Sequence, residues 1–202
     1  MVRDTTSLEV ARDRLALNAS LAPDMAFGLP DLHTRRTEPV LSVLWLLRRD
    51  IEARDRTARI AAMRAHPGEV RDWTRPGLDV ARATWLTCVR AIRLSRRIGA
   101  ARGRDLGTGG ERAARSFAEL AQLRLAFGLR LLSQGRVLVS DRLHGAILAL
   151  LMGIPHVALD NSTGKVHTFY GRWIAGDPLA RSAESLSEAA AMAQELVRAA
   201  GR

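Results

Sequence analysis

The chain has 202 residues, enough for one sizeable α/β core but not for two full nucleotide-binding-type domains. Its apolar runs are shorter than a membrane span, its first residues lack the apolar core of a signal peptide, and its single cysteine excludes a disulfide framework. We therefore expect a cytoplasmic protein. The net charge of +10 suits nucleic acid, an anionic membrane or a phosphorylated substrate equally well, so charge alone does not choose among them.

The first half of the chain is predicted to be mixed helix and strand. Residues 7–17 have helical content, and the apolar run VLSVLWLL at 40–47 predicts a buried parallel strand. A basic amphipathic helix is expected over residues 82–97, followed by a flexible glycine-rich connection at 99–110. A helical pattern then resumes over residues 111–133.

The second half alternates strands and helices with short turns between them. Strands are expected at 136–139 and 156–159, helices at 143–152 and 166–174, and an alanine-rich amphipathic helix at 185–200. Strand, helix, strand and helix in this order form a βαβα unit of a parallel sheet. The sequence therefore predicts an α/β fold, with a Rossmann-like parallel sheet flanked by helices.

The turn after the strand at 136–139 carries polar groups where open parallel sheets bind ligands. Ser140 or Asp141 would cap the next helix, and the guanidinium of Arg142 and the imidazole of His144 would lie in its first turn. Gly145 would let a ligand approach the backbone closely. Such a turn can hold a phosphate and deliver a proton. A purely structural role, with a cap, an ion pair and a packed histidine, is the alternative.

A second polar turn, DNSTGK at residues 160–165, follows the next strand. It offers hydroxyls, backbone N–H groups and the ammonium of Lys165, the only lysine in the chain, to an anion. It lacks the first glycine of a P-loop, because position 159 is leucine, and valine follows the lysine, so we exclude an NTPase. Taken alone, such a loop is more often structural than functional.

Both turns fall in a segment that resembles a known family. Residues 137–173, VLVSDRLHGAILALLMGIPHVALDNSTGKVHTFYGRW, closely resemble the signature region of the polysaccharide pyruvyltransferases, with its D-R-L-H-G turn, G-I-P strand entry and D-N-S-x-G-K turn. Upstream, PDMAF at 23–27 resembles the family's P-D-x-A-F, WLLRRDIE at 45–52 its L-x-R-x-D-x-E, and residues 3–7 its R-D-x-x-S. The resemblance covers most of the chain, and residues 71–110 match poorly.

The resemblance implies an architecture like the C-terminal half of a two-domain GT-B glycosyltransferase. Residues 1–38 would then be a remnant of the preceding domain and a linker, 39–180 the Rossmann-like donor-binding domain and 181–202 a C-terminal helix. The acceptor-side half would be missing, so we expect the chain to form no ketal by itself. The C-terminal helix would normally pack partly on that half and would here leave apolar surface exposed.

The activity implied by the resemblance is transfer of a pyruvyl group from phosphoenolpyruvate to a sugar of an exopolysaccharide or cell-wall glycan, as a ketal. His144 would be the general acid, because histidine titrates closer to neutral pH than other side chains. No cofactor or metal is implied. The catalytic residues would be His144 and Arg142, and the donor would be bound by Arg48, Ser140, Asp141, Leu143, Gly145, Asn161, Ser162 and Lys165.

Two other functional classes stay open at this point. One is a non-catalytic remnant that binds an anion or a partner, and the other is a GT-B-like glycosyltransferase that uses another donor. Nucleic acid is disfavoured, because few aromatic residues could stack on bases and no nucleic-acid-binding motif occurs. The basic helix at 82–97 would suit the inner face of a membrane and a lipid-linked acceptor, although a solvated face is its usual explanation. Homo-oligomer formation is also left open.

Overall fold

The computed structural model of the chain divides into two compact units. One consists of residues Met1–Asp72 together with Arg130–Arg202, and the other of residues Trp73–Leu129. The residues that the structure describes are 1–48, 69–71, 73, 81–82, 84–86, 89, 107–160 and 164–200.

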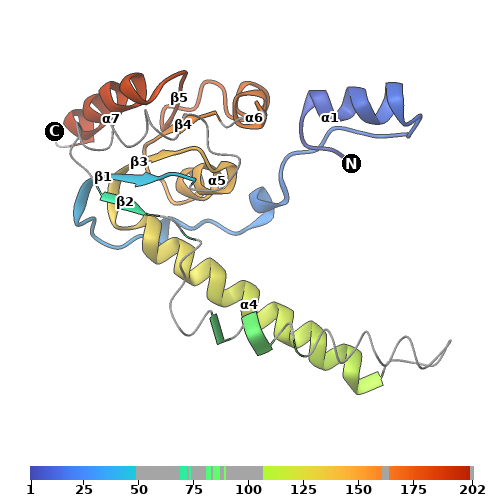
Figure 1. Cartoon of the computed structure of the whole chain (residues 1–202). Coiled ribbons are helices and arrows are strands. Elements are labelled where there is room, and N and C mark those ends of the chain that lie inside the picture. The colour runs from blue at the N-terminus through green and yellow to red at the C-terminus, as the bar shows by residue number, and fades with distance from the viewer. Residues whose placement is uncertain are drawn as a thin grey trace. The chain divides into compact units, whose positions relative to one another are not determined.

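A five-stranded sheet forms the centre of the first unit (Figure 1). Its strand order is β2-β1-β3-β4-β5 and every neighbouring pair is parallel, which confirms the predicted α/β class with a Rossmann-like parallel sheet. Apolar β-branched and leucine side chains fill the three central strands, as expected of strands covered on both faces. The strands are β1 Leu41–Leu46, β2 Glu69–Arg71, β3 Gly135–Ser140, β4 His156–Leu159 and β5 Ala180–Ala183.

Helices cover both faces of this sheet. Alternate residues of a strand point to opposite faces, so one set of strand side chains packs with α7 while the other set faces α5 and α6. The chain before the sheet contains only short helical segments. Among the described residues of this unit, the helices that cover the sheet are α5 Leu143–Leu151, α6 Lys165–Trp173 and α7 Leu186–Ala200, and the short segments are α1 Thr5–Glu9, the π-helix Val10–Arg14 and the 3₁₀ turns Met25–Gly28 and His33–Arg35.

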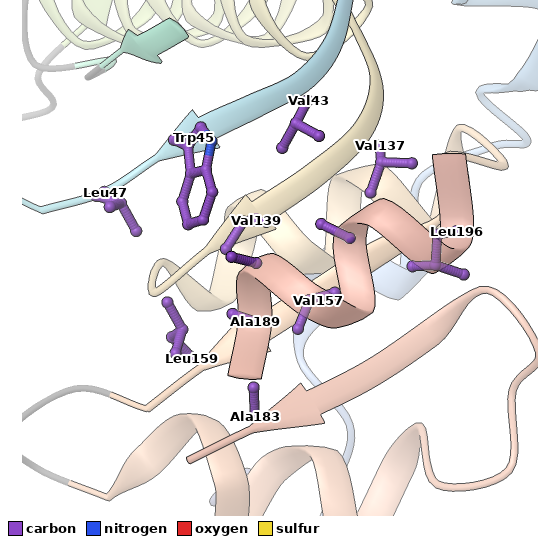
Figure 2. Close-up of a cluster of buried hydrophobic side chains, with 12 residues drawn as sticks. Val43, Trp45, Leu47, Val137, Val139, Val157, Leu159, Ala183, Ala189 and Leu196 are labelled. Atoms are coloured by element: carbon purple, nitrogen blue, oxygen red, sulfur yellow. The ribbon is translucent and has the colours of Figure 1, made fainter. Parts of the chain in front are cut away.

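The C-terminal helix α7 packs directly on the sheet. Its alanines Ala189, Ala190 and Ala193 are buried, and their small side chains let the helix lie close to Trp45 and its neighbours (Figure 2). Leu186 and Val197 are partly buried against the same cluster. The buried part of its apolar side therefore meets the sheet of its own unit, and the expected packing on another domain stays a prediction.

Most of the predicted elements in the described residues are present, with shifts of a few residues at their ends. Two strands were missed, β2 and β5, and both are short and contain charged or small polar residues. The flexible connection expected at 99–110 was wrong in its last part, because helix α4, Gly107–Leu132, already begins within it. The boundaries proposed at residues 38 and 180 stay predictions, although β5 straddles the second of them.

The second unit contains most of α4 and a few other described residues. Within it, Arg124 donates a hydrogen bond to the Thr84 hydroxyl at 3.4 Å, and the side chain of Trp85 is largely exposed. Most of the basic helix expected over 82–97, including Cys88, lies outside the described residues, as does the end of the WLLRRDIE motif after Arg48. None of the helices in the described part of the chain is both long and apolar enough to cross a membrane.

Candidate functional site

The carboxyl ends of β1 and β3 lie side by side, because Leu46 is paired in register with Ser140. The Ser140 hydroxyl donates to the Leu46 carbonyl at 3.1 Å and accepts from the backbone N–H of Arg142 at 3.0 Å. One carboxylate oxygen of Asp141 accepts from the backbone N–H of Arg48 at 2.9 Å. These buried hydrogen bonds therefore join the carboxyl ends of β1 and β3 and fix the path of the chain into α5.

The N-terminus of α5 is built differently from the prediction. Its N-cap is Arg142, in an extended conformation, and no side chain there forms a cap hydrogen bond. The cap expected from Ser140 or Asp141 was wrong, because the hydroxyl and the carboxylate are engaged at the strand ends. His144 does lie in the first helical turn, as predicted.

Gly145 has a packing role at the contact between α5 and β1. A Cβ atom at this position would lie 2.7 Å from a methyl carbon of Leu46 and 3.0 Å from the Ser140 hydroxyl oxygen. Glycine therefore lets α5 approach β1 closely, and the expected role of Gly145 at a ligand stays a prediction. Leu143, also named for the donor site, is buried in the core cluster shared by α5 and α6.

The imidazole of His144 faces a carboxylate from the N-terminal segment. Nε2 of His144 lies 3.4 Å from Oδ2 of Asp24, whose side chain is 8% exposed whereas that of His144 is 55% exposed. The same oxygen accepts a hydrogen bond from Nη1 of Arg3 at 2.9 Å, and Oδ1 accepts one from the backbone N–H of Ala26 at 3.0 Å. We call these three side chains the Arg3–Asp24–His144 cluster.

Two contacts with α6 hold the N-terminal segment in this position. Phe27 stacks on Phe169 of α6, with ring centroids 6.1 Å apart and an interplanar angle of 9°. The indole N–H of Trp173 donates to the backbone carbonyl of Arg3 at 2.9 Å. The stacked ring and the indole are both on α6, so this helix fixes the acid and the arginine of the cluster relative to the sheet.

The ordinary effect of burial on the pKa of Asp24 is reversed in the cluster. Burial alone would raise this pKa, but the hydrogen bonds from the Ala26 N–H and from Arg3 lower it, and so does the charge of His144. The net result is a pKa below the usual value for aspartate. Asp24 is therefore a permanent negative charge at neutral pH.

A pocket of about 680 Å³ is lined by two members of the cluster, Arg3 and Asp24, while His144 lies behind Asp24 and outside the lining. Asp4 also lines it, but its carboxylate is occupied by the backbone N–H and the hydroxyl of Ser7, at 2.7 and 2.9 Å. Lys165 is exposed, and no acid among the described residues is paired with its ammonium. The pocket thus offers a cation to a ligand while its acids are engaged internally. Its lining comprises Met1, Val2, Arg3, Asp4, Ser7, Ala22, Pro23, Asp24, Met25 and Lys165.

Comparison with known proteins shows the family of the chain. The family model described as polysaccharide pyruvyl transferase matches residues 1–163. The chain belongs to this family. The match includes the N-terminal acid, the D-R-L-H-G turn and the strands between them, and it ends before Lys165.

A curated relative is Pyruvyl transferase 1 of Schizosaccharomyces pombe (strain 972 / ATCC 24843). It is 42% identical over 62 residues, which make up 30% of this chain and 16% of that protein. The matched segment is therefore a small part of the relative.

The second polar turn of this pyruvyl transferase family member is only partly described. Asp160 accepts a hydrogen bond from the backbone N–H of Val166 at 3.2 Å, and Gly164 is the N-cap of α6, in a left-handed conformation with φ of 71°. Lys165 is therefore the first residue of α6. Asn161 and Ser162, which were predicted to bind the donor, lie outside the described residues.

Arg3 and Asp24 are the site residues that the sequence-based assignment did not name. Each stands in a motif that resembles the pyruvyltransferase family, R-D-x-x-S or P-D-x-A-F, but motif resemblance gave neither of them a role. The signal that could have found Asp24 is an acid placed directly before the apolar residues 25–27. Packing of the phenylalanine draws the nearby acid toward the protein interior. A carboxylate there must either stay in contact with water or be paired with a donor or a cation.

Proposed function

We propose that this family member transfers the pyruvyl group of phosphoenolpyruvate to a sugar as a cyclic ketal. The observation that carries the proposal is the Arg3–Asp24–His144 cluster beside a pocket that presents the Lys165 ammonium. An imidazole supplies a proton near neutral pH, and a nearby cation binds the phosphate or carboxylate of the donor. Family membership supports the same class of reaction.

In the proposed reaction, the His144 imidazolium donates a proton to the methylene carbon of phosphoenolpyruvate. The double-bond electrons form the new C–H bond and leave an oxocarbenium ion at the neighbouring carbon. One sugar hydroxyl adds to that carbon, the bond to the phosphate oxygen breaks, and a second hydroxyl closes the ketal. The two hydroxyl protons pass to the phosphate and back to the imidazole, so the overall products are the ketal and inorganic phosphate.

The arginines at the strand ends have the proposed task of holding the charged donor. Arg142 precedes the first turn of α5 and Arg48 follows β1, so both lie at the carboxyl edge of the sheet. A guanidinium pairs with a carboxylate or a phosphate through two parallel hydrogen bonds, which fixes orientation as well as charge. Arg142 is mostly buried, and its charge would therefore be screened little by solvent.

The acceptor in this proposal is a sugar of an exopolysaccharide or cell-wall glycan, with the reaction taking place in the cytoplasm. The family description names a polysaccharide, which supports the class of acceptor. The curated match covers only 16% of the relative. The transferase activity of the relative is therefore extended to this chain only as a proposal.

The test offers phosphoenolpyruvate and a panel of saccharides to the chain and, in parallel, to the longest gene product that contains it. Phosphate release is measured with a coupled assay, and the sugars are examined by mass spectrometry. From the longer product we expect phosphate and pyruvylated sugar in equal amounts, and neither without an acceptor; from the 202-residue chain alone we expect no ketal. Consumption of a nucleotide sugar instead would identify a glycosyltransferase. Binding of phosphoenolpyruvate without turnover in either form would favour the non-catalytic anion-binding remnant.

A further inference from the structure

The two ring nitrogens of His144 have different surroundings. Nε2 lies 3.4 Å from the Asp24 carboxylate, whereas Nδ1 has no hydrogen-bond partner among the described residues. Asp24 is nearly buried and the imidazole is about half exposed, so one edge of the ring faces the protein. The Nδ1 edge of the ring is therefore the edge without a partner among the described residues.

The carboxylate that faces Nε2 is held from two other directions. Arg3 donates to the oxygen nearest the imidazole, and the Ala26 N–H donates to the second oxygen. Neither oxygen can turn away from the cluster without losing one of these hydrogen bonds. Distances of this size in a ligand-free site commonly shorten when the reacting complex forms.

We propose that Asp24 is a positioning residue for His144, which keeps the proton of Nε2 facing the carboxylate and leaves Nδ1 as the nitrogen that exchanges a proton with the ligand. This inference rests on the proposed function for the identity of the ligand. In the transfer step, the Nδ1–H bond breaks, its proton forms the C–H bond on the methylene carbon, and the imidazole becomes neutral with Nε2 protonated. Asp24 keeps its charge throughout and stabilises the imidazolium before the transfer.

The chain contains a second aspartate and histidine pair that serves as a matched control. Asp31 accepts a hydrogen bond from the backbone N–H two residues ahead, as Asp24 does, and it lies 4.0 Å from Nε2 of His33. Its side chain is 75% exposed, so solvent screens its effect on the histidine, and it does not line the pocket beside the cluster. Asp31 therefore has the same local backbone hydrogen bond as Asp24, but its carboxylate is exposed rather than buried.

The experiment is carboxymethylation of the folded chain with bromoacetate, followed by separation of the two isomeric carboxymethylhistidines from each peptide. Alkylation modifies the ring nitrogen that is both unprotonated and accessible. At His144 we expect the Nδ1 product to predominate, whereas His33 in the same molecule should give mainly the Nε2 product, the usual preference of an exposed histidine. In Asp24→Ala, the product at His144 should shift toward Nε2 by about tenfold or more, a change of about 1.4 kcal/mol in preference. Asp31→Ala should leave the His144 ratio unchanged.

The comparison between His144 and His33 in the unaltered chain does not depend on any variant. Predominant Nε2 product at His144 there would overturn the proposal even if Asp24→Ala failed to fold. An unchanged ratio in folded Asp24→Ala would overturn it as well, because a merely structural acid does not direct alkylation to one nitrogen.

Phosphoenolpyruvate added before bromoacetate separates this inference from the proposed function. Protection of His144 but not His33 supports both. If Nδ1 reacts selectively but phosphoenolpyruvate gives no protection, the positioning role of Asp24 stands and the assignment of the donor fails.

Discussion

Oδ2 of Asp24 lies 3.4 Å from Nε2 of His144, and this contact joins the N-terminal segment to the first turn of α5. The acid comes from a segment with little regular structure, and the histidine comes from α5, a helix that packs on the sheet. Stacking of Phe27 on Phe169 brings the acid to the histidine. The candidate site therefore depends on both segments, and neither carries it alone.

Replacement of His144 by glutamine tests the proton donor. The glutamine amide can reach the position of Nε2 and keep the contact with Asp24, but it cannot deliver a proton. In the active enzyme we expect unchanged folding and donor binding and a fall in turnover of about 10²-fold or more. Near-normal turnover would exclude the role. A lower melting temperature, with activity lost only in proportion to unfolded protein, would indicate a structural histidine, and His33→Gln is the control.

Replacement of Lys165 by methionine tests the cation in the pocket. We expect weaker binding of phosphoenolpyruvate by calorimetry, with a difference from the unaltered protein that shrinks as salt rises, because the ammonium acts as a point charge. Arg136→Met is the matched control, since Arg136 is an exposed cation at the amino end of β3. Equal donor affinity at low salt for Lys165→Met and the unaltered protein would remove Lys165 from the site.

Replacement of Gly145 by alanine tests the packing of α5 on β1. The added methyl group would lie 2.7 Å from a Leu46 carbon, so we expect a loss of about 1–3 kcal/mol in the free energy of unfolding by urea titration. Gly171→Ala in α6 is the control, since nothing lies within 4 Å of its added methyl group. There the better helix propensity of alanine should stabilise the protein by up to about 1 kcal/mol. Equal effects of the two substitutions would contradict the packing role.

The buried His156 predicts a dependence of stability on pH. Burial lowers its pKa below the ordinary value of 6.5, although a hydrogen bond to the Ile154 carbonyl and the charge of Asp177 partly oppose this. The unfolded chain therefore binds a proton near pH 6.5 while the folded chain does not, so stability is complete above that pH and is lost as pH falls. The slope contributed by one such group approaches about 1.4 kcal/mol per pH unit.

His156→Asn isolates this contribution, because asparagine keeps a donor near the Ile154 carbonyl but does not titrate. Urea titrations between pH 5 and 8 should show a shallower loss of stability at low pH for the variant, whatever its stability at pH 8. Parallel curves for the two proteins would show that His156 becomes protonated in the folded state as readily as in the unfolded state.

The sequence predicted the parts of the fold whose signal is local. The apolar runs of β1, β3 and β4 and the glycine after α5 mark their elements, because burial on both faces and a left-handed turn each impose a composition. The strands β2 and β5 carry no such signal, since Glu69–Arg71 and Ala180–Ala183 are short and become strands by pairing with an existing sheet edge.

The candidate site was predictable only in part, for a similar reason. His144 and Lys165 follow strand ends, which is a position that sequence order reveals. The pairing of Asp24 with His144 is a contact between segments distant in the sequence. The steric clash that any larger residue would cause at position 145 likewise involves a distant residue, Leu46 of β1. Neither can be read from the residues next to it in the chain.

The most direct test of the account is whether phosphoenolpyruvate binds beside Lys165. Reductive methylation with ¹³C-formaldehyde labels this residue, the only lysine in the chain, and retains its charge. In a titration followed by NMR, we predict that phosphoenolpyruvate shifts the Lys165 methyl signal in a saturable way and at lower concentration than pyruvate or inorganic phosphate does. A signal that phosphoenolpyruvate leaves unmoved, while a nucleotide sugar shifts it, would contradict the account.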